Sequence, residues 1–119
     1  MRLFHSFILT LTLISVSFAG VTLTLDGNDV NYVSTDDIAG FQFNVDGASV
    51  EGASGGDAAA SGFTISNSST TVLGFSLTGG VIPAGEGTLL SLTLNGTATG
   101  LSALVFSDSS GSSIDSQYS

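Results

Sequence analysis

Positively charged side chains are almost absent from this sequence of 119 residues. Arg2 and His5 are its only basic or imidazole groups, against 10 acidic residues, and it contains no cysteine and no tryptophan. Without cysteine there are no disulfides and no thiolate metal ligands. The shortage of lysine and arginine argues against nucleic-acid binding, because such side chains neutralise phosphates and release their counterions. It also removes most of the groups that enzymes use for acid–base and nucleophilic catalysis.

The first 19 residues have the parts of a secretory signal peptide. A short region with Arg2 precedes an apolar run at residues 7–18, and small residues lead to a predicted cleavage point after Ala19. The run is too short to span a bilayer, and no second run of that length follows, so we expect no membrane insertion after cleavage. The predicted organisation is a signal peptide (1–19) and a single secreted domain (20–119), located outside the cell or at its surface.

The predicted mature domain is strongly acidic. Loss of Arg2 with the signal peptide takes the formal side-chain charge from −9 to −10, and removing 19 of 119 residues leaves 100. This is the size of one ordinary domain. Such a charge favours solubility and attracts cations, while it repels anionic lipid and phosphate surfaces.

Short apolar runs separated by glycine predict an all-β domain. All 16 glycines lie beyond residue 19, and the runs between them are rich in Val, Leu, Ile, Phe and Thr. Asp26-Gly27 and Asp46-Gly47 are predicted hairpin turns, since both residue types tolerate a positive φ. The pattern favours a β-sandwich of about seven to nine strands. The predicted strands lie at residues 21–25, 30–33, 40–47, 63–66, 72–77, 87–96 and 104–106.

Alternation of apolar and polar residues assigns faces to several of these strands. In GFQFNVDG, residues 40–47, the apolar side chains are predicted to face the core, and Gln42 and Asn44 to face outward. In GTLLSLTLNG, residues 87–96, Leu89 is assigned to the side opposite the core. The other side chains predicted to face the core are Leu73, Phe75, Leu77, Leu90, Leu92 and Leu94, with Phe63 and Ile65.

Two sequence motifs stand out, one at residues 82–114 and one at residues 38–47. Residues 82–114 contain an acidic-glycine loop, a strand of the pattern G-x-L-x-x-L-x-L and a strand ending in SDSSG, and residues 38–47 read IAGFQFNVDG. In order and spacing these motifs resemble cohesin-like domains, over roughly residues 38–114. The resemblance implies a jelly-roll-type β-sandwich, a fold similar to that of carbohydrate-binding modules. It also implies a non-catalytic extracellular module that docks another protein or a polysaccharide.

A polar sheet face is the expected binding surface under this resemblance. Gln42 and Asn44 are the predicted hydrogen-bonding residues, and Tyr32 is the predicted amphipathic anchor. Polysaccharide binding is an alternative, and sugars usually stack on exposed aromatic rings. Only Tyr32 and Tyr118 are tyrosines in the predicted mature domain, which favours a protein or another surface component as the partner.

Carboxylates are the remaining candidates for catalysis and metal binding. Asp36-Asp37 is the obvious pair, but neighbouring residues in a turn seldom converge on one bond, so we do not predict an enzyme. Calcium prefers oxygen ligands, which acidic turns provide, although the same turns also suit plain solvated loops. No other cofactor is expected. The candidate calcium ligands are Asp26, Asn28, Asp29 and Asp108.

Self-assembly is a structural alternative to docking. A sandwich without its closing strand would leave an unpaired edge, and such edges accept strands from neighbouring subunits. The VTLTL segment at residues 21–25 is apolar at alternate positions and uncharged, so it is a suitable donor. This alternative predicts homo-oligomers or filaments outside the cell.

Overall fold

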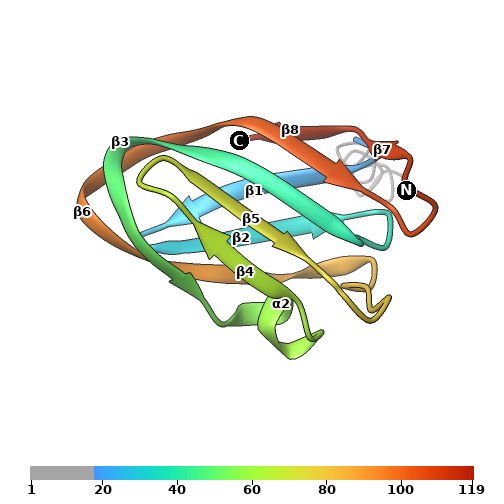
Figure 1. Ribbon diagram of the computed structural model, residues 1–119. Coiled ribbons are helices and arrows are strands. Elements are labelled where there is room, and N and C mark those ends of the chain that lie inside the picture. Colours follow the sequence, from blue (N-terminus) through green and yellow to red (C-terminus); the bar gives the residue numbers. More distant parts are fainter. Residues whose placement is uncertain (1–17) are drawn as a thin grey trace, which may run out of the picture.

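The computed structural model describes residues 18–119, which form a two-layered β-sandwich with one short helix (Figure 1). Most of the predicted signal peptide, with Arg2 and His5, lies outside the described residues. Within residues 18–119 there is no helix of the length and apolar character that a membrane span requires. The elements are β1 (Val21–Asp26), β2 (Asp29–Ser34), β3 (Gly40–Ser54), α2 (Gly56–Ala60), β4 (Thr64–Asn67), β5 (Thr71–Phe75), β6 (Gly85–Ser107), β7 (Ser113–Ile114) and β8 (Ser116–Tyr118).

Two long strands, β3 and β6, belong to both layers. Residues 40–46 of β3 pair with residues 100–107 of β6, and residues 48–54 pair with residues 91–96, all antiparallel. The first paired part is extended by β5 and then β4, which form the front layer with it. The other end of β6 is extended by β2, β1 and β8, which form the second layer with it. The layers are therefore joined by bent strands, and the prediction of an all-β sandwich with seven to nine strands is confirmed.

The two predicted hairpin turns differ in outcome. Asp26-Gly27 is confirmed as the turn between β1 and β2, with Asp26 opposite Asp29 and Gly27 at a φ of 62°. The prediction for Asp46-Gly47 is wrong, because the chain continues along β3. Gly47 does adopt a positive φ of 87°, but it does so where the register shifts before Ala48. Its conformational freedom serves a bend between layers and not a reversal of the chain.

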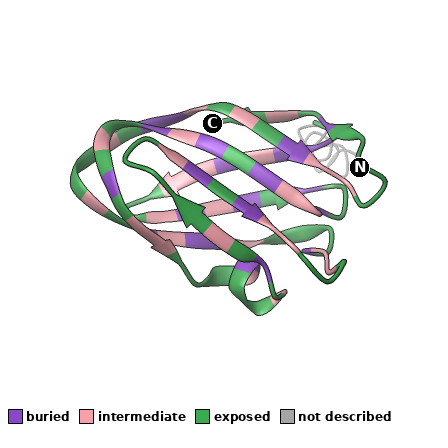
Figure 2. Ribbon diagram, viewed as in Figure 1, coloured by how far each residue is buried: buried purple, intermediate pink, exposed green. Residues whose placement is uncertain are grey.

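The core is centred on Phe41. Its ring stacks against those of Phe43, Phe63 and Phe106, with ring centroids 6.0–6.1 Å apart. Phe43 is fully buried and Phe41 is 3% exposed, which confirms the inward face predicted for residues 40–47. Figure 2 shows the same alternation of buried and less buried residues along β3 and β5. Because the aromatic rings fill the interior, the alternate residues of β3 must point outward.

The predicted inward face of β5 is wrong. Val72 is fully buried, whereas Leu73 is 37% exposed and Leu77, beyond the strand, is 76% exposed. Phe75 is half-buried. The cause lies at Gly74, which packs directly against the Phe41 ring and leaves no room for a larger residue. Thr71, Leu73 and Phe75 therefore point outward, while Val72 and Gly74 face the aromatic cluster.

The predicted faces of β6 are correct except at Leu89. Leu90 and Leu92 are buried and Leu94 is half-buried, but Leu89 is fully buried as well. The register with β2 shifts at this point, so that Val30 lies opposite Leu90 and the next pair skips Leu89. A bulge places two consecutive side chains in the interior, which strict alternation does not allow.

The VTLTL segment lies inside a sheet. It forms β1, which pairs with β2 on one side and in parallel with β8 on the other, over Val21–Leu23 and Ser116–Tyr118. The expectation that the sandwich lacks its closing strand is therefore wrong. Donation of β1 to a neighbour would break both pairings, which removes the basis for the predicted strand exchange.

Close packing at Gly74 gives a test of the fold. In Gly74→Ala, the added methyl group overlaps with the Phe41 ring. We expect the free energy of unfolding of residues 20–119, measured in urea, to fall by about 1–3 kcal/mol. Gly52→Ala is the matched control, because its methyl group would have its nearest neighbour at 3.6 Å. Equal losses in both variants would contradict the described packing.

Candidate functional site

The outward side of the β4, β5, β3 and β6 layer is the candidate site, and we call it the front face. It consists of the outward side chains of residues 64–67, 71–75, 40–46 and 100–107. Side chains opposite each other in antiparallel strands point to the same side. The register thus aligns one row across all four strands: Ser66, Leu73, Gln42 and Val105.

The middle of this row combines apolar and amide groups. Gln42 is exposed, as its sequence pattern predicts, and lies between Leu73 and Val105. Those two side chains are 37% and 55% exposed. The row therefore presents two aliphatic groups on either side of a hydrogen-bonding amide, a combination that suits recognition of another protein.

Cross-strand hydrogen bonds order the side chains next to the row. Asn44 is half-buried, and its Oδ1 accepts a hydrogen bond of 2.8 Å from the Thr71 hydroxyl of β5. The Ser102 hydroxyl of β6 donates to Asp46 Oδ1, also over 2.8 Å. The Asn44 bond fixes the orientation of the side chain, so that its amide nitrogen is available as a donor. Gln42 and Asn44 therefore lie together on one face, as predicted.

The front face carries little charge on a strongly acidic chain. Of the 10 acidic residues in the sequence, Asp46 alone belongs to the strand segments that form this face. The other carboxylates lie in turns, on α2 or on the second layer. Charged residues are depleted at the centres of protein–protein interfaces because their desolvation is costly. The distribution of charge therefore marks the front face as the surface most suited to close contact.

Leu73 and Val105 are contributors that sequence reasoning missed. Leu73 was assigned to the core, and Val105 was included in a predicted strand without an assigned face. The signal for both was the pair of phenylalanines in GFQFNVDG, which already fill the interior. Gln42 then points outward, and the residues opposite it on the two neighbouring strands, Leu73 and Val105, point outward with it.

Tyr32 does not belong to this surface. It is 4% exposed, on the inward side of β2, and its hydroxyl donates a hydrogen bond of 2.6 Å to Asp57 Oδ2 on α2. Burial first, and then the bond to the Asp57 carboxylate, raise the pKa of the Tyr32 phenol well above its usual value. The prediction of a surface anchor is wrong because β2 alternates with Val30 and Tyr32 inward. Its role is to attach α2 to the second layer.

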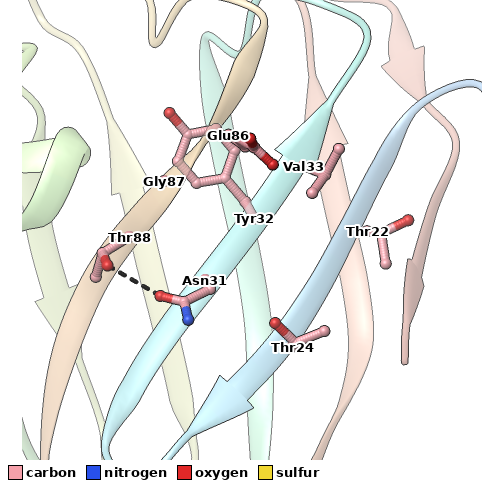
Figure 3. A pocket seen from close by; sticks show the side chains of 8 residues that line it. All are labelled: Thr22, Thr24, Asn31, Tyr32, Val33, Glu86, Gly87 and Thr88. Carbon is pink, nitrogen blue, oxygen red and sulfur yellow. Dashed lines mark hydrogen bonds between the residues drawn. The ribbon is translucent and has the colours of Figure 1, made fainter.

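The outward side of the second layer carries a polar groove (Figure 3). The groove has a volume of about 350 Å³, and Thr88 donates a hydrogen bond of 2.9 Å to Asn31 Oδ1 across it. Hydroxyl and amide groups of this kind suit sugars, but Tyr32 contributes little exposed ring for stacking. The residues that line the groove are Thr22, Thr24, Asn31, Tyr32, Val33, Glu86, Gly87 and Thr88.

The four predicted calcium ligands do not form one site. Asp26, Asn28 and Asp29 lie at the turn between β1 and β2, whereas Asp108 follows β6 at the opposite end of the sandwich (Figure 1). In residues 18–119 no three acidic or histidine side chains are grouped closely enough to hold a metal ion. Calcium binding at the β1–β2 turn stays a prediction.

Asp108 organises its own loop. Its Oδ1 accepts a side-chain hydrogen bond of 2.7 Å from Ser110 and a backbone hydrogen bond of 2.9 Å from Ser112. These bonds, the one from the Ser110 hydroxyl first, hold the pKa of the Asp108 carboxyl below its usual value. The SDSSG motif is therefore explained by a turn that the aspartate closes.

The Asp36-Asp37 pair also serves local structure. Asp36 Oδ1 accepts a hydrogen bond of 2.8 Å from the Thr35 hydroxyl, and Asp37 Oδ1 accepts one of 2.9 Å from the backbone N–H of Ala84. The two carboxylates bond to different segments and do not converge on a common point. Each carboxylate thus accepts a hydrogen bond within its own part of the loop region.

Comparisons with known proteins give a likeness in structure. Neither a protein-family model nor a curated protein sequence matches the chain. Among solved structures, the chain is similar to a non-cellulosomal cohesin from the hyperthermophilic archaeon Archaeoglobus fulgidus. The TM-score is 0.60 at 17% sequence identity, and the match covers 84% of this chain and 86% of the cohesin chain. The fold is thus a cohesin-like β-sandwich, as the sequence motifs suggested.

The hydrogen bond between Tyr32 and Asp57 gives a second test. In Tyr32→Phe, the Asp57 carboxylate loses its donor, and we expect the free energy of unfolding to fall by about 1–3 kcal/mol. Tyr118→Phe is the matched control, because Tyr118 is 37% exposed. The raised pKa of Tyr32 has a further consequence. The unfolded phenol ionises first, so stability should decline above about pH 10, and by less in Tyr32→Phe. Identical alkaline denaturation curves would contradict this role.

Proposed function

We propose that the chain is a secreted, non-catalytic docking module that binds another extracellular protein or a cell-surface component through its front face. The observation that carries this proposal is the row Leu73, Gln42 and Val105, which is exposed and nearly free of charge on an otherwise acidic chain. The cohesin-like fold supports it, since a sandwich of this kind presents a broad sheet surface.

The residues of the front face have distinct roles in the proposed contact. Leu73 and Val105 supply the apolar area that binding removes from water. They take the role of apolar anchor that the sequence analysis predicted for Tyr32. Gln42 and Asn44 give specificity through hydrogen bonds, and Thr71 holds Asn44 in place. The partner surface would match this pattern with aliphatic groups around hydrogen-bonding groups. Basic residues at its rim would be attracted by the surrounding carboxylates.

Mutation of the face tests the proposal directly. Residues 20–119 are immobilised, bound proteins are recovered from the extracellular and surface fractions of the source organism, and one identified partner is purified for affinity measurement. We expect the triple variant Gln42→Ala, Leu73→Ala, Val105→Ala to raise the Kd at least tenfold, or about 1.4 kcal/mol. Each variant is checked for an unchanged melting temperature.

A control variant on the second layer distinguishes the two faces. Thr22→Ala with Val33→Ala alters the polar groove, where Val33 is 54% exposed, and we expect an unchanged Kd. The opposite result, weaker binding only in the groove variant, would reject the front face. That result would favour polysaccharide binding in the groove. Retardation of the protein during affinity electrophoresis in gels that contain soluble polysaccharides would then detect it.

The mass in solution separates docking from self-assembly. Because β1 is paired on both sides, we expect light scattering of residues 20–119 to give the mass of a monomer across a range of concentrations. The measurement is repeated with calcium and then with a chelator. Assemblies that grow with concentration would favour a structural subunit instead, and their dissociation by the chelator would identify calcium as the bridging ion.

A further inference from the structure

Gly20, the first residue after the predicted cleavage point, is buried. Ala19 is exposed, but Gly20 is buried at the end of the sandwich. The Gly20 nitrogen donates a hydrogen bond of 2.7 Å to Thr35 Oγ1, and the Gly20 carbonyl accepts one of 3.0 Å from the Thr35 N–H. The next residue, Val21, donates to the Asp115 carbonyl over 2.9 Å. The point at which the mature chain would begin is therefore fixed in a defined position.

Two acidic residues line a pocket at this position. A pocket of about 230 Å³ is lined by Ala19 and Gly20 together with Asp36 and Asp115. Asp36 follows β2, and Asp115 lies between β7 and β8. The Thr35 hydroxyl, which accepts from the Gly20 nitrogen, donates in turn to Asp36 Oδ1 over 2.8 Å. The Gly20 nitrogen is thus connected through one hydroxyl to a carboxylate.

We propose that this pocket is a binding site for the amino terminus of the mature chain. Hydrolysis of the Ala19–Gly20 amide by an export protease adds water across the bond and leaves a carboxylate on Ala19 and an ammonium group on Gly20. The ammonium keeps the hydrogen bond to Thr35 and directs its remaining N–H groups toward Asp36 and Asp115. The inference rests on the predicted cleavage and is independent of the proposed docking.

The composition of the mature domain makes this ammonium unusual. Residues 20–119 contain no lysine, arginine or histidine, so the amino terminus is their single positive charge against 10 carboxylate side chains. No other group in residues 20–119 can therefore form an ion pair with Asp36 or Asp115. The ion pair of the amino terminus would link the start of β1 to the loop after β2 and to the segment before β8, which closes the sheet.

Glycine is required at this position. Gly20 has a φ of 118°, which other residues rarely adopt, and a Cβ atom there would overlap with the Asp115 carbonyl oxygen. The backbone of Gly20 lies close to that of Asp115, and Gly20 has no side chain between its nitrogen and the pocket. A small first residue is thus explained by the folded structure, in addition to the cleavage motif before it.

The pH dependence of stability isolates this one group. Free α-amino groups titrate near pH 8, carboxyl groups near pH 4 and tyrosines near pH 10. Between pH 6 and 9 the α-amino group is thus expected to be the main titrating group in residues 20–119. An ion pair binds the proton more tightly in the folded state, so its stabilisation is present at low pH and lost as the pH rises.

Two chemical forms of the mature chain provide the test. Mass spectrometry of the exported protein first identifies its amino terminus, and a start other than Gly20 would overturn the proposal. For the free-amine form, we expect the melting temperature to fall by about 4 °C from pH 6.5 to 9.0. The Nα-acetylated form keeps the N–H donor but has no charge, so its melting temperature should be constant and lower at pH 6.5.

Variants identify the partner carboxylate. Asp36→Asn in the free-amine form should lose at least half of the pH-dependent change in melting temperature. Asp26→Asn, an exposed residue at the opposite end of the sandwich, is the control and should keep the full change. Equal changes in the two variants, or no pH dependence in the free-amine form, would overturn the proposal. Neither result depends on whether the front face binds a partner.

Discussion

The continuous pairing of β3 with β6 is the constraint from which the rest of the structure follows. Both strands cross from one layer to the other, with β3 bending at Gly47, and they remain hydrogen-bonded on either side of that bend. This pairing joins the layers, encloses the stacked rings around Phe41 and fixes which residues of β3 face inward. Gln42 is on the surface because its neighbours on either side are in the core, and β5 and β6 align Leu73 and Val105 beside it.

Much of the fold was predictable from local pattern, and the exceptions have identifiable causes. Glycine spacing and alternation predicted the strands and the outward position of Gln42. The face of β5 was mispredicted because leucine is usually buried, and the contact that turns Leu73 outward, between Gly74 and Phe41, joins residues far apart in the sequence. Tyr32 was assigned to the surface, but it is buried. The acceptor of its hydroxyl, Asp57, is likewise distant along the chain, so local pattern does not reveal the contact. Asp46-Gly47 has the composition of a turn, and only its pairing with β6 shows a bend within a strand.

The distribution of charge distinguishes the front face from the rest of the surface. A chain with almost no cations cannot neutralise its carboxylates internally, so they lie in turns and on the second layer and leave the front face weakly charged. That face then combines exposed aliphatic groups with amides ordered by cross-strand hydrogen bonds, such as the bond between Asn44 and Thr71. In the proposed docking, the cohesin-like sandwich would support this face.

Nuclear magnetic resonance of the complex tests the central claim most directly. Residues 20–119, labelled on methyl and side-chain amide groups, are titrated with the partner protein recovered from the source organism. The account predicts that the signals of Leu73, Val105 and the Gln42 amide shift first and most strongly, while those of Thr22 and Val33 stay unchanged. Shifts confined to Thr22 and Val33, with an unaltered Gln42 signal, would contradict the assignment of the front face as the docking surface.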